Sequence, residues 1–404
     1  MSDPSIYRQL GVSPVLNAAG TFTDFGGSLM HPETSDAWRA AAREFVDMKQ
    51  WQDCLGRKVA DLLDVEAAMI TGGAANSILL GTAAAICSRI GCEASRLPLD
   101  PSQGYHVLRQ RSHRDPYDQQ VRCCGVKIVD VDPGASLANL INERTVMLMA
   151  YNVYEPESTV PRQIWLETAR QHQIPTMLDA AADVPPASQL AAYVNGGYDL
   201  VAYSGGKAIR GPQDTGLLLG RSELIAHAKR CASPNEGVIG RVTKVTKEDM
   251  VAFWFALKRF FRQDAQQIVP QCEARLKVIE KILADLPSVE TERVIPPVAN
   301  PFPHLIVHWN DDQLPTRDDV RHALRTGEPG IVTSRVYGTG DKGLLISVIN
   351  LRDDDAQSWS GGTCLPLQRP RPRLGCNVLR AWQLSRVVLP VSGMGMRRLR
   401  RVQR

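Results

Sequence analysis

The sequence predicts an α/β protein whose main domain is built on a mainly parallel β-sheet. Short apolar runs alternate with helical patterns through the middle of the 404-residue chain, an order typical of βαβ units. Several of these runs are apolar at every position, as strands covered on both faces are. The chain is also longer than one simple core usually supports, which favours a second domain.

The large domain is expected to contain buried strands joined by helices. The expected strands are Glu66–Thr71, Val126–Val131, Thr145–Tyr151, Pro175–Asp179, Asp199–Ser204 and Gly216–Gly220. A small-residue helix should follow the first strand as far as Ile86, and a second helix should cover Ile164–Gln173. A long amphipathic helix should begin near Thr246, whose hydroxyl can cap it together with Asp249 three residues on.

The remaining segments predict a smaller α+β domain and two peripheral parts. A helix at Ala274–Leu286 and strands near Leu305–Trp309 and Gly343–Val348 are expected to form the small domain. The predicted boundaries are an N-terminal arm at 1–35, the large domain at 36–262, the small domain at 263–357 and an arginine-rich tail at 358–404.

The tail differs in composition from the rest of the chain. From Ser358 to Arg404 there are ten arginines and neither lysine nor acidic residues. One interpretation is a basic interaction tail. The other, which we favour, is a disordered extension or a shifted reading frame that has replaced a natural C-terminal helix.

Charge, cysteines and hydropathy exclude several classes of protein. The formal charge of +4 comes from the tail, and without it the body carries 37 basic and 43 acidic residues, a net of −6. A mildly acidic body makes nucleic-acid binding an unfavoured function. The nine cysteines have no metal-ligand spacing, so we expect no metal site and reduced thiols in the cytoplasm. No signal pattern and no apolar run of about 20 residues is present, so a membrane location is not expected.

The first feature that carries chemistry is the segment Thr71–Asn76, T-G-G-A-A-N, between a predicted strand and a predicted helix. Glycines allow a tight turn, and the free N–H groups at a helix start attract a phosphate. An ordinary strand-to-helix turn is the alternative interpretation.

The second feature is Asp179 at the end of an apolar strand, and the third is Lys207 within Tyr203–Gln213. Ligands bind at the carboxyl edge of open α/β sheets, where Asp179 could pair with a pyridinium nitrogen. Lys207 could form a Schiff base, and the hydroxyl of Ser204 could donate to a phosphate. Alternatively, Asp179 caps a helix and Lys207 is a solvated loop residue. A glycine turn, an aspartate and a lysine 28 residues later is nevertheless the chain order of a pyridoxal-phosphate site on this fold.

Five segments together resemble a known family of enzymes. They read VLNAAGTFTDFGGS, MITGGAANSILL, MLDAAADVPP, YSGGKAIRGPQDTGLLLG and GRVTKVTKED. The chain is similar over about Leu10 to Asp355 to the selenocysteine synthase-like group of fold type I pyridoxal-phosphate enzymes. This group includes seryl-tRNA selenium transferase and D-glucosaminate-6-phosphate ammonia-lyase.

The resemblance implies a fold and a set of site residues. The large domain would be pyridoxal-phosphate-dependent transferase-like, with a seven-stranded sheet. Lys207 would be the Schiff-base lysine and Asp179 the partner of the pyridinium nitrogen. The cofactor phosphate would be held by Gly72, Gly73, Ala74 and Ser204.

Two residues that follow an expected strand are further candidates. His113 could act as a catalytic residue by stacking on the cofactor ring, although a surface-loop histidine is an equal alternative. Arg114 beside it could bind an anionic substrate.

Two other segments are candidates for substrate or phosphate binding. Asn17, Thr21 and Thr23 lie in the N-terminal arm, which in this group resembles a wall of the active site; a structural turn is the alternative. Arg241 and Lys244 could bind a phosphate or carboxylate, in their own subunit or across a subunit interface.

The resemblance favours a lyase over the other chemistries of the group. The expected reaction is an α,β-elimination on a small amino acid or amino sugar acid, phosphorylated or not, that releases ammonia and a 2-oxo acid. The alternatives are a selenium transferase acting on charged tRNA, and transamination or racemisation through the same residues. We also expect a homodimer or a larger homo-oligomer.

Overall fold

The computed structural model describes residues 5–262, 264–284, 289–309, 316–327, 330–335 and 343–352. The described residues form two compact units. One gathers the described residues within 5–19, 275–293 and 305–352, and the other the described residues within 20–274 and 294–304. The predicted arginine-rich tail at 358–404 lies outside the described residues.

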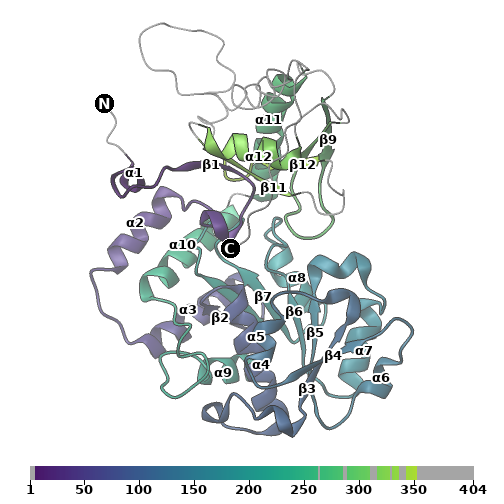
Figure 1. Ribbon diagram of the computed structural model, residues 1–404. Helices are drawn as coiled ribbons and strands as arrows, with labels where there is room; N and C mark the ends of the chain where they lie inside the picture. Colours follow the sequence, from purple (N-terminus) through teal and green to yellow (C-terminus); the bar gives the residue numbers. More distant parts are fainter. Residues whose placement is uncertain are drawn as a thin grey trace, which may run out of the picture. The chain divides into compact units, whose positions relative to one another are not determined.

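The larger unit contains a seven-stranded sheet in the order β2-β8-β7-β6-β5-β3-β4 (Figure 1). These strands are β2 (Ala67–Thr71), β3 (His106–Gln110), β4 (Lys127–Val131), β5 (Thr145–Tyr151), β6 (Thr176–Asp179), β7 (Leu200–Ser204) and β8 (Gly216–Gly220). Only β8 runs antiparallel to its neighbours within this sheet. The predicted α/β class with a mainly parallel sheet is therefore confirmed. Because β2 and β7 both oppose β8, the carboxyl ends of the other six strands meet at one edge.

Helices flank this sheet. They are α2 (Pro32–Ala41), α3 (Met48–Leu63), α4 (Ala74–Ile90), α5 (Asp118–Arg122), α6 (Leu137–Leu140), α7 (Arg162–Gln171), α8 (Gln189–Asn195), α9 (Ser222–Arg230) and α10 (Lys247–Arg262). The expected cap of α10 is confirmed, because the hydroxyl oxygen of Thr246 accepts from the backbone N–H of Asp249 at 3.1 Å. None of the described helices combines the length and apolarity that a membrane span requires.

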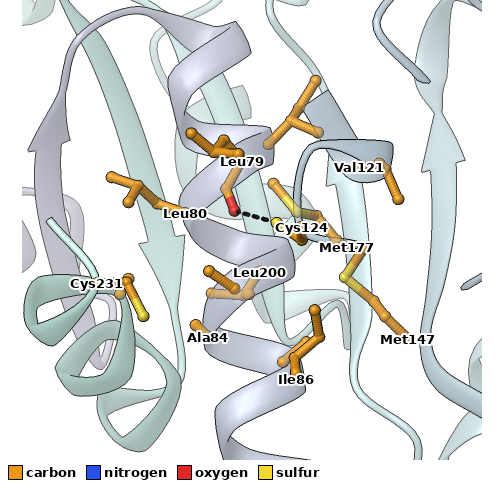
Figure 2. Packing of buried hydrophobic residues seen from close by; sticks show 14 of the residues in the cluster. Leu79, Leu80, Ala84, Ile86, Val121, Cys124, Met147, Met177, Leu200 and Cys231 are labelled. Carbon is orange, nitrogen blue, oxygen red and sulfur yellow. Dashed lines mark hydrogen bonds between the residues drawn. The ribbon is translucent and has the colours of Figure 1, made fainter. Parts of the chain in front are cut away.

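Helix α4 is the centre of the hydrophobic core (Figure 2). Its residues from Asn76 to Cys87 are all buried, on every side of the helix. Small residues allow this close packing: a Cβ on Gly81 would lie 2.6 Å from the Met177 sulfur of β6. Figure 2 also shows the thiol of Cys124 donating to the carbonyl oxygen of Leu79, at 3.5 Å. This packing fixes the position of the helix start that follows β2.

The smaller unit contains a five-stranded sheet in the order β1-β11-β12-β10-β9. Its strands are β1 (Val15–Ala18), β9 (Val289–Val294), β10 (His304–Trp309), β11 (Gly330–Arg335) and β12 (Gly343–Ser347), and its helices include α1 (Ile6–Gln9) and α12 (Arg317–Thr326). The expected N-terminal arm thus contributes a strand, because β1 pairs in parallel with β11. The predicted start of a helix at Ala274 is wrong: α11 covers Asp264–Leu283 and contains Pro270 in its second turn. Pro270 removes one backbone N–H donor from the second turn, and the helix continues past it.

Candidate active site

The turn between β2 and α4 is shaped to receive an anion. Gly73 has φ of 95°, a left-handed conformation that favours glycine, and α4 begins without a side-chain hydrogen bond to its first turn. The N–H of Gly72 donates to the side chain of Asn76 at 3.0 Å. The N–H groups at the start of α4 therefore lack a side-chain cap, and together with the positive end of the helix dipole they can bind a phosphate.

Backbone from two other segments packs closely around this turn. A Cβ on Gly216 would lie 2.4 Å from the carbonyl carbon of Gly73, and one on Gly72 would lie 2.8 Å from the carbonyl oxygen of Thr243. The amide of Asn76 also donates to the Thr243 hydroxyl at 2.5 Å. Only glycine fits at these two positions, so the turn is held from both sides.

This packing brings the predicted anion-binding segment beside the glycine turn. Arg241 and Lys244 flank Thr243 and are both exposed. Asn76 and Thr243 were not among the predicted site residues. Asn76 could have been predicted, because it is the last residue of the segment T-G-G-A-A-N. Nothing in the sequence linked Thr243 to that turn.

The loop that carries Lys207 is tightly hydrogen-bonded. The N–H of Gly205 donates to the carbonyl of Thr215, and the N–H of Gly211 donates to the carbonyl of Gly205, both at 2.8 Å. The N–H of Arg210 donates to the carbonyl of Lys207 at 2.9 Å. Lys207 is partly exposed as a residue, and these hydrogen bonds hold its backbone in one conformation.

Asp179 lies at the same edge as Lys207. It ends β6, which pairs with β7, the strand that precedes the lysine. Its carboxylate accepts from the N–H of Ala181 at 2.9 Å. Burial raises the pKa of Asp179 to about 6, while the positive charge of Lys207 acts in the opposite direction. Burial lowers the pKa of Lys207, and the negative charge of Asp179 opposes that change. The two groups therefore interact electrostatically.

Asp183 is a further carboxylate near Lys207 that the sequence analysis missed. It is buried, and it accepts from the amide of Asn152 at 2.5 Å and from the N–H of Ala299 at 3.0 Å. Asn152 in turn accepts from the guanidinium of Arg162 at 2.6 Å. Burial raises the pKa of Asp183. The sequence could have indicated Asp183, because it is a second aspartate only four residues after Asp179.

His113 is fully buried and both of its ring nitrogens are occupied. Its Nδ1 accepts from the N–H of Tyr151 at 3.2 Å, so its Nε2 carries the proton and donates to the Ser158 hydroxyl at 2.8 Å. Burial lowers the pKa of His113 to about 4. The surface-loop interpretation is therefore wrong, and no ring nitrogen is available for proton transfer. Stacking on a cofactor stays a prediction.

The other predicted residues are distributed around this edge. Arg114 is exposed and pairs with Asp130. Ser204, at the end of β7, is partly exposed. The carbonyl of Thr23 accepts from the side chain of Gln213 in the lysine loop at 3.0 Å, which places that part of the arm beside the loop.

The remaining two residues of the arm differ in position. Thr21 lies two residues before Thr23, in the larger unit. Asn17 belongs to β1 of the smaller unit, and its side chain accepts from the N–H of Ala19 at 3.0 Å.

The residues present fit pyridoxal phosphate. A helix start without a side-chain cap, a partly exposed lysine with a lowered pKa and a carboxylate at the end of β6 lie at one sheet edge. These are the groups that bind a phosphate, a carbonyl carbon and a pyridinium nitrogen. The described cysteines are free thiols, and no group of metal-binding side chains was found among the described residues.

Comparisons with known proteins agree with this geometry. The chain is 30% identical to D-glucosaminate-6-phosphate ammonia lyase of Salmonella typhimurium, over 72% of this chain and 80% of the relative. It is 29% identical to 5'-C-glycyluridine monooxygenase-decarboxylase of a Streptomyces species, over 68% and 70%. It is 26% identical to L-seryl-tRNA(Sec) selenium transferase of Serratia proteamaculans, over 59% and 55%. No family model matches the chain.

Solved structures show the same fold. A structure of D-glucosaminate-6-phosphate ammonia-lyase superposes with a TM-score of 0.72 at 25% identity, covering 96% of this chain and 99% of that one. Serine palmitoyltransferase of Sphingomonas wittichii superposes with a TM-score of 0.56 at 10% identity, covering 93% and 89%.

Proposed function

Because the chain belongs to the selenocysteine synthase-like family of fold type I pyridoxal-phosphate enzymes, we propose that it is a lyase that binds this cofactor through Lys207. The proposed reaction is an α,β-elimination on a small amino acid or amino sugar acid. The observation that carries this proposal is the meeting of Lys207, Asp179 and the start of α4 at one sheet edge.

Each residue at this sheet edge would have a separate role in binding the cofactor or in moving a proton. The first N–H groups of α4 and the hydroxyl of Ser204 would hold the phosphate. Asp179 would keep a proton on the pyridine nitrogen. When bound, the cofactor supplies a ring that accepts the electron pair left on the substrate Cα. Lys207, whose pKa is lowered by burial, would take the Cα proton at its Nζ. The substrate would then lose its β-substituent, and water would release ammonia and a 2-oxo acid.

The substrate class is proposed from the neighbourhood of the site and from a relative. Arg241 and Lys244 lie beside the glycine turn and could bind a second anionic group of the substrate. The ammonia lyase relative is named for a phosphorylated amino sugar acid. The glycyluridine relative is named for another reaction at a similar identity, so transamination, racemisation and decarboxylation belong in the same test.

A selenium transferase is the less favoured alternative. The chain spans 55% of the length of the selenium transferase from Serratia. The body without the tail also carries a net charge of −6, which is unfavourable for binding tRNA. We further propose a homodimer or larger homo-oligomer, which light scattering would test.

The test begins with the visible absorption spectrum of the purified full chain reconstituted with pyridoxal phosphate. We expect a visible band that borohydride removes and that Lys207→Ala lacks. Lys127→Ala, at an exposed position of β4, is the matched control and should keep the band. A second stage measures ammonia and 2-oxo acid release from hydroxy- and phospho-amino acids and from amino sugar acids.

The outcomes separate the cofactor from the reaction. A protein that gives no band with pyridoxal phosphate would overturn the proposal. A band that persists in Lys207→Ala would assign the linkage to another lysine. A normal band with amino-group transfer or racemisation, but without ammonia release, would replace the lyase by one of the other reactions.

A further inference from the structure

We propose that a pocket at the amino ends of β6 and β7 is a binding site for a small phosphate monoester. The pocket has a volume of about 480 Å³ and lies wholly within the larger unit. This inference does not rest on the proposed function, because none of the lining residues belongs to the glycine turn, the lysine loop or the end of β6.

The pocket and the candidate active site lie at opposite edges of one sheet. Thr176 begins β6 and lines the pocket, whereas Asp179 ends the same strand at the other edge. Asp199 lines the pocket just before β7, and Ser204 ends that strand. Helix α4 likewise starts at the glycine turn and reaches the pocket with Ser88 in its last turn. A ligand in the pocket would therefore not occupy the cofactor site.

Three arginines from three different elements line the pocket. Arg89 lies in the last turn of α4, Arg170 lies in the last turn of α7, and Arg221 directly follows β8. The guanidinium of Arg170 lies against Gly197, since a Cβ on that glycine would be 3.4 Å from its Nη2. A phosphate monoester carries about two negative charges near neutral pH, and its oxygens can accept paired N–H groups from several guanidinium groups.

Several of the donors around the pocket have no competing partner. The side chains of Arg89, Arg170 and Gln173 all line it, and none makes a hydrogen bond or ion pair to another residue in the part of the chain that the structure describes. A phosphate among these three side chains would gain hydrogen bonds without breaking existing ones.

The carboxylates near the pocket are already paired. Asp199 accepts from the N–H and the hydroxyl of Thr176, both at 2.8 Å, and from Arg221 at 3.4 Å. Glu223 accepts from Arg221 at 3.1 Å and from the Ser88 hydroxyl at 3.0 Å. Three arginines against these two carboxylates leave one positive charge in excess, which favours an anion.

The size and lining of the pocket leave room for an organic group beside the phosphate. Its volume lies within the range of about 300–1,000 Å³ that is usual for small-molecule sites. The apolar part of the lining comes from Leu166, Ala169, Ile174 and Pro175. A ligand with an apolar body should therefore bind more tightly than the bare anion.

Arg89 and Arg170 also have an alternative role that does not involve a ligand. Basic side chains in the last turn of a helix complement its dipole. That role accounts neither for Arg221, which follows a strand, nor for the unused amide of Gln173. It predicts that removing either charge lowers stability and leaves ligand binding unchanged.

The experiment is isothermal titration calorimetry with phenyl phosphate. The full chain is loaded with pyridoxal phosphate and reduced with borohydride, so that the glycine turn is occupied. We expect binding at one site, weakened roughly tenfold or more in Arg89→Gln and in Arg170→Gln, because each loses a charged pair of donors. Arg57→Gln, at an exposed position of α3 outside the pocket, is the matched control and should bind like the wild type. Inorganic phosphate should bind roughly three- to tenfold more weakly than phenyl phosphate.

A second measurement uses the wild type alone and does not depend on the folding of a variant. Phenylglyoxal modifies exposed arginines, and mass spectrometry gives the rate at each position. Phenyl phosphate should slow the modification of Arg89 and Arg170, both exposed, and leave the exposed Arg57 unchanged.

The outcomes distinguish this inference from the proposed function. If the chain takes up no pyridoxal phosphate, the proposed function fails, and the same titrations without cofactor still decide whether the arginines of the pocket bind the probe. Absence of binding up to millimolar phenyl phosphate would overturn the inference. Equal affinities of wild type, Arg89→Gln and Arg170→Gln, together with unprotected arginines, would also overturn it. Equal affinities for phenyl phosphate and inorganic phosphate would refute the assignment of a monoester.

Discussion

Replacing Asp179 by asparagine should stabilise the cofactor-free protein while it weakens cofactor binding. The pKa of Asp179 is raised by burial from 3.8 to about 6, so the folded state binds its proton more tightly than the unfolded chain does. As pH rises from about 4 to about 6, the folded state must ionise this buried carboxylate and loses stability. Above pH 6, the raised pKa of Asp179 lowers the free energy of unfolding by about 3 kcal/mol.

Asparagine cannot ionise and therefore avoids this cost. Its side-chain oxygen can still accept from the N–H of Ala181, as Asp179 does. We expect Asp179→Asn to raise the free energy of unfolding by about 2–3 kcal/mol at pH 7.5 and by almost nothing near pH 4. The assay is urea denaturation of the cofactor-free protein across this pH range. The exposed Asp61→Asn serves as the control and should show no pH-dependent gain.

The same variant should bind pyridoxal phosphate more weakly, because a neutral amide does not hold a proton on the pyridine nitrogen. A titration of the visible band at pH 7.5 would measure the loss. The reasoning is refuted if Asp179→Asn gains the same stability at every pH, or if it is less stable than the wild type at pH 7.5.

Three other substitutions probe the packing of the site. Gly216→Ala places a Cβ 2.4 Å from the carbonyl carbon of Gly73, so cofactor affinity should fall by about tenfold or more, or about 1.4 kcal/mol, in the same absorbance titration. Asn152→Ala removes a donor to the buried Asp183 and should lower the free energy of unfolding by about 2–4 kcal/mol in denaturant melts; an unchanged midpoint would contradict this. Ala299 has φ of 54°, so Ala299→Gly should raise that free energy by about 1 kcal/mol, and a lower melting temperature would contradict the strain argument.

The sheet of the larger unit was predictable because its strands are marked locally. Strands β5 and β8 begin and end at the predicted residues, Thr145–Tyr151 and Gly216–Gly220. Both are apolar throughout and buried at every position, which is the pattern of a covered strand. Strand β1 is different: it has four residues, only one of which is buried. Its partner β11 lies more than 300 residues further along the chain, and no local pattern can indicate such a pairing.

The residues of the candidate site likewise include some that a local sequence pattern indicates and others whose partners lie far along the chain. Lys207 and Asp179 were predicted because their chain order around glycines matches a known arrangement, and the structure brings them to one edge. His113 was ambiguous because the hydroxyl that binds its Nε2 belongs to Ser158, 45 residues later.

The stability of the cofactor-free protein and its affinity for the cofactor should change in opposite directions. Several of its features are unfavourable in the cofactor-free chain: α4 begins without a side-chain cap, burial raises the pKa of Asp179, and burial lowers the pKa of Lys207. A bound phosphate would satisfy the N–H groups of the helix start, and a pyridinium would neutralise the carboxylate. Cofactor binding would thus remove costs that folding alone leaves in place, so it should stabilise this unit beyond the contacts that it adds. A substitution that removes one of these costs in advance, as Asp179→Asn does, should therefore lower cofactor affinity by a comparable free energy.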